Sequence, residues 1–172
     1  VQGPRDLGIA PALYLARAIH TDLVVGQAAA WQWWLAISPY DYKDGLVYVD
    51  QNKTDGHYYP SKMLWALGNY SRFVRPGAVR LTATLADSVR AGQPLVSAYR
   101  SADGRQLITV VVNDYDTPAT VQLELAGGPP PGSGQVFVTS ATANLAPGPA
   151  LGAGQPLAVA PRSIVTLVSR WR

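Results

Sequence analysis

The chain has 172 residues, enough for one ordinary domain or slightly more, and 48% of its residues are hydrophobic. It contains no cysteine, which excludes a disulfide scaffold, thiol catalysis and cysteine-ligated metal sites. No apolar run approaches the roughly 18 residues of a membrane span, and the first residues lack the basic-then-apolar pattern of a signal peptide.

The net charge of +3 is unevenly distributed along the chain. Residues 1–60 carry a net charge of −2, whereas residues 61–100 carry +5. The basic residues of the second stretch are Lys62, Arg72, Arg75, Arg80, Arg90 and Arg100. Because they are spread over one predicted helix and two predicted strands, they indicate solvated side chains, and we expect no nucleic-acid partner.

The first predicted element is a helix over residues 7–22, where apolar residues recur at helical spacing. Asp6 is its expected N-cap, Pro11 falls near its first turn, and Gly26 ends the segment. The apolar run of residues 28–37 follows at once. A run that is apolar on both faces and follows a helix predicts a buried parallel strand.

A polar and aromatic loop is expected from Ser38 to about Pro60, with a short β-like stretch at residues 46–50. Ser61 is the expected N-cap of a second helix, which Pro76-Gly77 ends. Arg72 and Arg75 are expected in its last turns, where positive charge suits the negative helix end.

After Gly77 short runs rich in valine, leucine, isoleucine and threonine alternate with turn residues. The predicted strands are 79–85, 95–100, 106–113, 120–125, 135–139, 157–159 and 163–169. Residues 101–104 predict a hairpin turn, and residues 127–134 and 146–156 predict loops rich in proline and glycine. Strands of this length and spacing predict an antiparallel β-sandwich.

The predicted fold class is therefore α+β, with a boundary at Pro76-Gly77. Residues 1–77 have the pattern of the last β/α units of a (β/α)8 barrel, and residues 78–172 that of a β-sandwich side domain. A helix, a strand, a loop and a second helix do not make a domain by themselves. We therefore expect the chain to be a fragment that lacks the earlier barrel strands.

The densest chemical signal is the aromatic group around residues 31–34 and the tyrosines of the following loop. At the C-terminal end of a barrel strand, flat rings can stack on sugars while polar neighbours bind hydroxyl groups. The alternative is that the tryptophans pack between the strand and its helices. Strand alternation places Trp31 and Trp33 on one face and Trp34 on the other, so the three cannot share one role.

Several kinds of catalytic or metal site have little support. The chain has ten aspartates and a single glutamate, Glu124, so a mechanism that requires two glutamates cannot be completed. His20 and His57 belong to no cluster with metal-ligand spacing, and we expect no metal or cofactor. No G-x-S-x-G turn supports a serine nucleophile. Paired aspartates of the loop remain possible as an acid and a base.

Residues 58–80 carry a specific resemblance to a known family. Their Ser-Lys start, Gly-x-Tyr-Ser-Arg-Phe centre and Arg-Pro-Gly end resemble the last barrel helix and domain junction of family 30 glycoside hydrolases. This family includes glucosylceramidases, glucuronoxylanases and endo-β-1,6-galactanases. Residues 30–34 resemble its eighth barrel strand, and residues 107–113 and 161–166 resemble strands of its side domain.

The resemblance implies retaining hydrolysis of a β-linked polysaccharide or glycoside by two glutamates, after barrel strands four and seven. The first helix resembles the one after strand seven, so neither catalytic residue matches a position here, and the isolated chain is expected to be inactive. The resemblance assigns substrate contacts to Trp34, Tyr40, Tyr42 and Lys43. The Arg-Asp-Leu-Gly opening and the loop at residues 38–50 resemble bacterial β-1,6-galactanase-type members more than glucosylceramidases.

The resemblance also implies a carbohydrate substrate, a missing N-terminal barrel segment as partner, and a secreted or periplasmic, bacterial protein without a membrane partner. The alternative function is a non-catalytic β-sandwich, either a structural brace or a carbohydrate-binding module. Beyond residue 80 the only aromatic residues are Tyr99, Tyr115, Phe137 and Trp171. Because most of them are expected in the core, the brace is favoured over the binding module.

Overall fold

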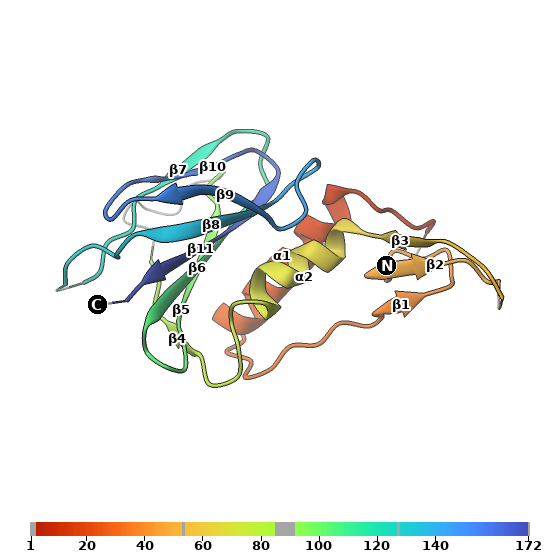
Figure 1. Ribbon diagram of the computed structural model, residues 1–172, viewed down its shortest axis with the longest axis horizontal. Helices are drawn as coiled ribbons and strands as arrows, with labels where there is room; N and C mark the ends of the chain where they lie inside the picture. The colour runs from red at the N-terminus through yellow and green to blue at the C-terminus, as the bar shows by residue number, and fades with distance from the viewer. Residues whose placement is uncertain (1–2, 53, 85–91, 127, 172) are drawn as a thin grey trace.

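The computed structural model describes residues 3–52, 54–84, 92–126 and 128–171 (Figure 1). The helices are α1 (Ile9–Val24) and α2 (Lys62–Ser71). The strands of the first part are β1 (Ile37–Ser38), β2 (Val47–Val49) and β3 (Tyr58–Pro60). The later strands are β4 (Val79–Leu81), β5 (Leu95–Arg100), β6 (Gln106–Asn113), β7 (Ala119–Val121), β8 (Gly134–Thr139), β9 (Ala146–Leu151), β10 (Leu157–Val159) and β11 (Ser163–Arg170).

The residues after Gly77 form the predicted antiparallel β-sandwich. Its large sheet has the order β4-β5-β6-β11-β8-β9, and a smaller sheet pairs β10 with β7. The smaller sheet packs on one face of the large one through Val121, Leu157 and Val159, which meet Val111 and Leu167. These valines and leucines alternate with residues that face the other side, so β6 and β11 are buried on both faces.

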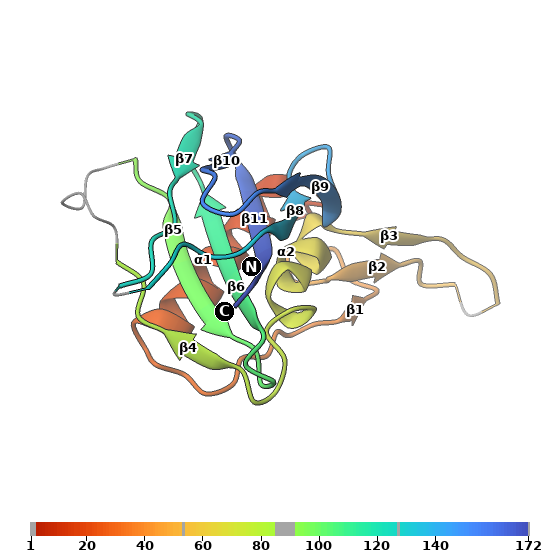
Figure 2. The same ribbon diagram turned by 60° about the vertical axis from the view of Figure 1, so that its left-hand side comes forward.

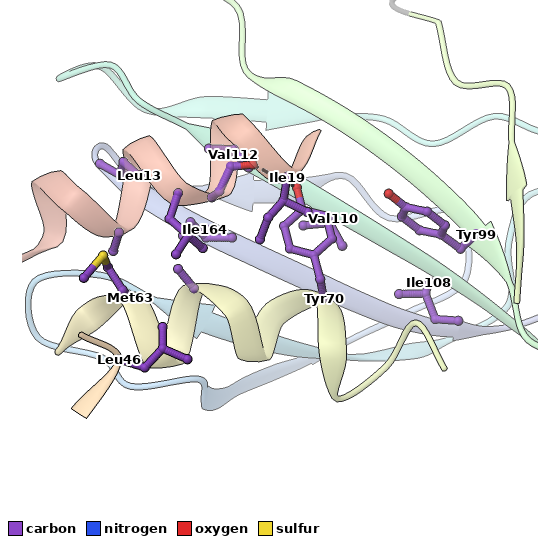
Figure 3. Close-up of a cluster of buried hydrophobic side chains, with 14 residues drawn as sticks. Leu13, Ile19, Leu46, Met63, Tyr70, Tyr99, Ile108, Val110, Val112 and Ile164 are labelled. Atoms are coloured by element: carbon purple, nitrogen blue, oxygen red, sulfur yellow. Dashed lines mark hydrogen bonds between the residues drawn. The ribbon is translucent and has the colours of Figure 1, made fainter. Parts of the chain in front are cut away.

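Helices α1 and α2 cover the second face of the large sheet, as Figures 1 and 2 show. Figure 3 shows Leu13 and Ile19 of α1 and Met63 of α2 packed toward Val110 and Ile164 of the sheet. These side chains are at most 1% exposed. The helices of the predicted barrel part and the strands of the predicted side domain therefore share one hydrophobic core.

The second helix follows the prediction closely, with one difference at its end. Ser61 is the N-cap residue as expected, but α2 ends at Ser71, so Arg72 is the C-cap residue and Arg75 lies outside the helix. The Arg75 guanidinium still donates a hydrogen bond to the Ser71 carbonyl, at 2.8 Å. Its charge therefore lies near the negative end of the helix, although Arg75 itself follows the last turn.

The first helix begins later than predicted, with Gly8 as its N-cap residue. The Asp6 carboxylate accepts a hydrogen bond from the backbone N–H of Gly8, at 2.8 Å. Asp6 therefore fixes the turn before the helix and does not cap it. Pro11 lies in the first turn, as expected.

Two predicted elements are wrong. Residues 28–36 form no strand, and only Ile37–Ser38 of the predicted run becomes β1, which does pair in parallel with β2. Residues 146–151, predicted as loop, form β9 instead. The predicted strands 79–85 and 120–125 are shorter, at Val79–Leu81 and Ala119–Val121, and Leu85 lies outside the described residues.

His20 lies near the end of α1 and is 8% exposed. Burial lowers its pKa below the ordinary value of 6.5. Among the described residues its Nδ1 atom has no hydrogen-bond partner.

Because the unfolded chain binds a proton at His20 at higher pH than the folded chain, acidification below pH 6.5 favours unfolding. We expect the free energy of unfolding to decrease between about pH 7.5 and about pH 5.5, and less so in the variant His20→Gln. Urea unfolding at both pH values measures the difference. An equal decrease in both proteins would contradict a contribution from His20.

Candidate functional site

The predicted sugar-binding residues lie around a small three-stranded sheet. Strand β1 pairs in parallel with β2, and β2 pairs antiparallel with β3. This sheet extends away from the two helices and the sandwich (Figure 2). It positions the loop between β1 and β2, which carries Tyr40, Tyr42 and Lys43.

Tyr48 on β2 fixes this loop from inside. Its side chain is fully buried, and burial raises its pKa. The Tyr48 hydroxyl donates a hydrogen bond to the Tyr42 carbonyl, at 2.5 Å, and accepts one from the Gly45 N–H, at 3.1 Å. Gly45 is required there, because a Cβ atom would lie 2.8 Å from the Ser38 Cβ atom.

Trp31 and Trp33 share one environment and Trp34 has another, as strand alternation predicts, although none of the three lies on a strand. Trp31 and Trp33 are half-buried and stacked, with ring centroids 5.8 Å apart. The Trp31 Nε1–H donates to the Asp22 carboxylate and the Trp33 Nε1–H to the Asp44 carbonyl, each at 2.7 Å. Trp34 is 78% exposed. Trp31 and Trp33 are therefore structural, and Trp34 is available to a ligand.

The structure brings some of the four predicted contact residues together. Tyr40 and Tyr42 are both more than half exposed, and their ring centroids are 6.3 Å apart. Lys43 instead lines a hollow of about 260 Å³ beside Trp33 and Tyr14. The role of all four residues in binding substrate stays a prediction.

Two residues near this sheet were absent from the predicted site. The backbone N–H of Arg5 donates to the Asp41 carboxylate, at 2.9 Å, and its guanidinium lies 5.0 Å from the centre of the Tyr59 ring. Tyr58 on β3 is 74% exposed. Arg5 is 36 residues from Asp41, so no local pattern connects them. The alternation of β3 could have identified Tyr58 as an outward-facing residue.

The carboxylates offer little acid-base chemistry. Asp50 accepts a hydrogen bond from the backbone N–H of His57, at 2.8 Å, and this bond, with the His57 ring, lowers its pKa. A general acid requires the opposite shift. Glu124 is exposed in the segment after β7. The described residues contain no group of three His, Cys, Asp or Glu side chains that could hold a metal ion.

Neither helix of the described chain has the length and apolar character that crossing a bilayer requires.

Comparison with known proteins gives consistent matches. The family model described as O-Glycosyl hydrolase family 30 matches residues 1–48. Glucuronoxylanase XynC of Bacillus subtilis (strain 168) is 29% identical over 137 residues, which cover 80% of this chain and 28% of the relative. The chain thus spans little more than a quarter of this relative's length.

Solved structures resemble most of the chain. A conserved exported protein from Bacteroides fragilis superposes with a TM-score of 0.79 and 28% identity, over 93% of this chain and 33% of that one. A GH30 endoxylanase from Clostridium papyrosolvens C71 superposes with a TM-score of 0.78 and 22% identity, over 99% of this chain and 40% of the other. The matches confirm the family resemblance and the β-sandwich. The relatives' xylanase names do not confirm the resemblance to galactanases or glucosylceramidases.

Proposed function

We propose that this chain, which corresponds to the C-terminal part of a family 30 glycoside hydrolase, supplies part of the sugar-binding surface of a retaining enzyme. Its substrate is a β-linked polysaccharide. The names of the relatives favour a xylan over the β-1,6-galactan suggested by the loop sequence. The export of one relative supports a secreted or periplasmic location.

The observation that carries this proposal is the contrast between Trp34 and its neighbours. Trp31 and Trp33 are half-buried, stack on each other and have bonded N–H groups, whereas Trp34 leaves 78% of its surface exposed. A large exposed ring on the segment before β1, with Tyr40 and Tyr42 exposed on the segment after it, suits stacking on the apolar faces of sugars. Polar groups of the loop can then bind the sugar hydroxyls.

The partner in this proposal is an N-terminal barrel segment that carries both catalytic glutamates. The hollow beside Trp33 and Lys43 is lined mainly by apolar side chains of α1 and α2, among them Ala10, Pro11 and Met63. Such an apolar surface is suited to burial beneath further barrel strands. Residues 1–77 then complete the barrel, and residues 78–172 form the side domain that supports it.

Replacing Trp34 by alanine tests the sugar-binding role. We expect the dissociation constant for glucuronoxylan, measured by electrophoresis through gels containing the polysaccharide, to rise about tenfold, because the stacking surface is lost. The matched control is Tyr115→Ala, which removes a 42% exposed ring from the sandwich and should leave binding unchanged. Equal binding by Trp34→Ala and the unaltered chain would contradict the proposal.

A further inference from the structure

Arginines that are far apart in the sequence gather at one end of the large sheet. Strand β5 ends at Arg100, a turn carrying Arg105 leads into β6, and β11 ends at Arg170. Arg170 lies opposite Gln106 in the β6–β11 pair, and Arg100 lies opposite Leu107 in the β5–β6 pair. Neighbouring strands are about 4.8 Å apart, so these arginines share one edge of the sandwich.

The end of α2 places one more arginine over the large sheet, above Phe137, whose β11 partner Thr166 lies four residues before Arg170. The Arg72 guanidinium lies 5.2 Å from the centre of the Phe137 ring on β8 and 5.5 Å from that of Phe73. Phe137 and Gln135 lie on the same face of β8, two residues apart. Arg72 is therefore placed over the sheet face that continues toward Gln135 and Arg170.

The charge at this end is almost entirely positive. Segments 72–84, 95–113, 128–139 and 163–171 contain Arg72, Arg75, Arg80, Arg100, Arg105 and Arg170. Their single acidic residue is Asp103. It accepts hydrogen bonds from the Ser101 hydroxyl, at 2.6 Å, and from the Arg105 N–H, at 3.1 Å. Folding thus places Arg80, Arg100, Arg105 and Arg170, which are dispersed in the sequence, at one end of the large sheet.

A hollow of about 290 Å³ lies at this end of the large sheet, and Arg170 is the one arginine in its described lining. It is lined by Gln106, Ser133, Gln135, Ser169 and Arg170, together with Ala150. The Gln135 side-chain amide donates to the Gly148 carbonyl, at 2.6 Å, which fixes its orientation. In the part of the chain that the structure describes, the side-chain amide of Gln106 has no hydrogen-bond partner. The hollow therefore offers amide groups and a guanidinium to a ligand rich in hydroxyl groups.

We propose that this arginine-rich end binds an acidic polysaccharide. Guanidinium groups of Arg105 and Arg170 pair with the carboxylates of uronic acid residues, and the amide groups of the hollow bind the sugar hydroxyls. Nucleic acid fits less well, because single-stranded bases need exposed aromatic rings, and Trp171, whose backbone N–H donates to the Arg105 carbonyl, is half-buried. Phe73 and Phe137, the rings that the structure describes beside Arg72, are half-buried and lie beneath its guanidinium.

Electrophoresis of the 172-residue chain through gels containing polygalacturonate tests this inference. We expect retardation at low salt, loss of retardation at about 0.3 M salt, and no retardation by fully methyl-esterified pectin, whose carboxylates are masked. In the double variant Arg105→Gln/Arg170→Gln the dissociation constant should rise about tenfold. The variant Arg105→Lys/Arg170→Lys keeps the charge and should bind with intermediate affinity.

The matched control is Arg17→Gln/Lys62→Gln, which removes the same charge at the opposite end of the large sheet, beside Asp114 and Asn144, and should bind polygalacturonate like the unaltered chain. Equal losses in both double variants would mean a general charge effect and would overturn the proposal. So would a loss confined to the control, which would place binding at the opposite end of the large sheet, or tighter binding of duplex DNA. Glucuronoxylan also carries uronic acid carboxylates, so the Trp34 test is run at about 0.3 M salt, where binding by the arginine-rich end is lost. Under that condition the two proposals can fail separately.

Discussion

Replacing Asn69 by leucine should lower the free energy of unfolding by about 2–4 kcal/mol. Asn69 is fully buried on α2, between the helix and the large sheet. Its side-chain amide donates to the Thr139 hydroxyl, at 2.6 Å, and to the Trp65 carbonyl, at 2.9 Å. Its side-chain oxygen accepts from the Thr166 hydroxyl, at 2.9 Å. Leucine would leave two buried threonine hydroxyls with fewer partners and add no new ones.

Urea unfolding measures the effect of Asn69→Leu as a lower midpoint with an unchanged slope. The control is Asn52→Ala, since Asn52 is exposed and its side chain bonds only to Thr54 among the described residues. This change should stay within about 0.5 kcal/mol. A similarly small effect of Asn69→Leu would show that α2 is held to the sheet by apolar contacts alone.

Elements with strong local signals could be predicted from the sequence. The bounds of β5, β6 and β10 agree with the prediction, because each is a β-branched or apolar run bounded by turn residues. The turn at Ser101–Gly104 also forms, with the Gly104 N–H donating to the Ser101 carbonyl and a φ of +72° at Gly104. Local patterning therefore determines most of the sandwich.

Elements that depend on distant partners were not predictable in this way. Residues 28–36 are apolar enough for a buried strand, but in the described chain their strand-like pairing is limited to the end of the segment, where the Leu46 and Val47 N–H groups donate to the Leu35 and Ala36 carbonyls. Strand β9 was missed because it contains Pro147 and Pro149. As an edge strand it pairs only with β8, so missing N–H groups on its open side cost little.

The candidate sites, too, could be predicted only where their residues are close together in the sequence. Trp34, Tyr40 and Tyr42 follow from residue type and spacing, and all three are exposed. The contact between Arg5 and the ring of Tyr59 arises from the tertiary fold. So does the placement of Arg100, Arg105 and Arg170 at one end of the large sheet. Sequence patterns locate aromatic surfaces well, because they are local. They locate charge clusters poorly when each member comes from a different strand.

The isolated chain should hydrolyse polysaccharide no faster than buffer does. Retaining hydrolysis needs two carboxyl groups about 5–5.5 Å apart, one as nucleophile and one as acid. Glu124 is the single glutamate, and it is exposed after β7. The lowered pKa of Asp50 keeps that group ionised and unsuited to act as an acid. The expected rate is therefore at least about 10⁶-fold below that of an intact enzyme.

The most direct test is reducing-sugar release from glucuronoxylan by the purified 172-residue chain, with intact XynC as the positive control. The variant Trp34→Ala identifies a contaminating hydrolase, whose activity this substitution would not change. We predict no release above buffer by the chain alone, although the chain binds the polysaccharide. Steady release that Trp34→Ala abolishes would place a complete catalytic site within these residues and contradict the account.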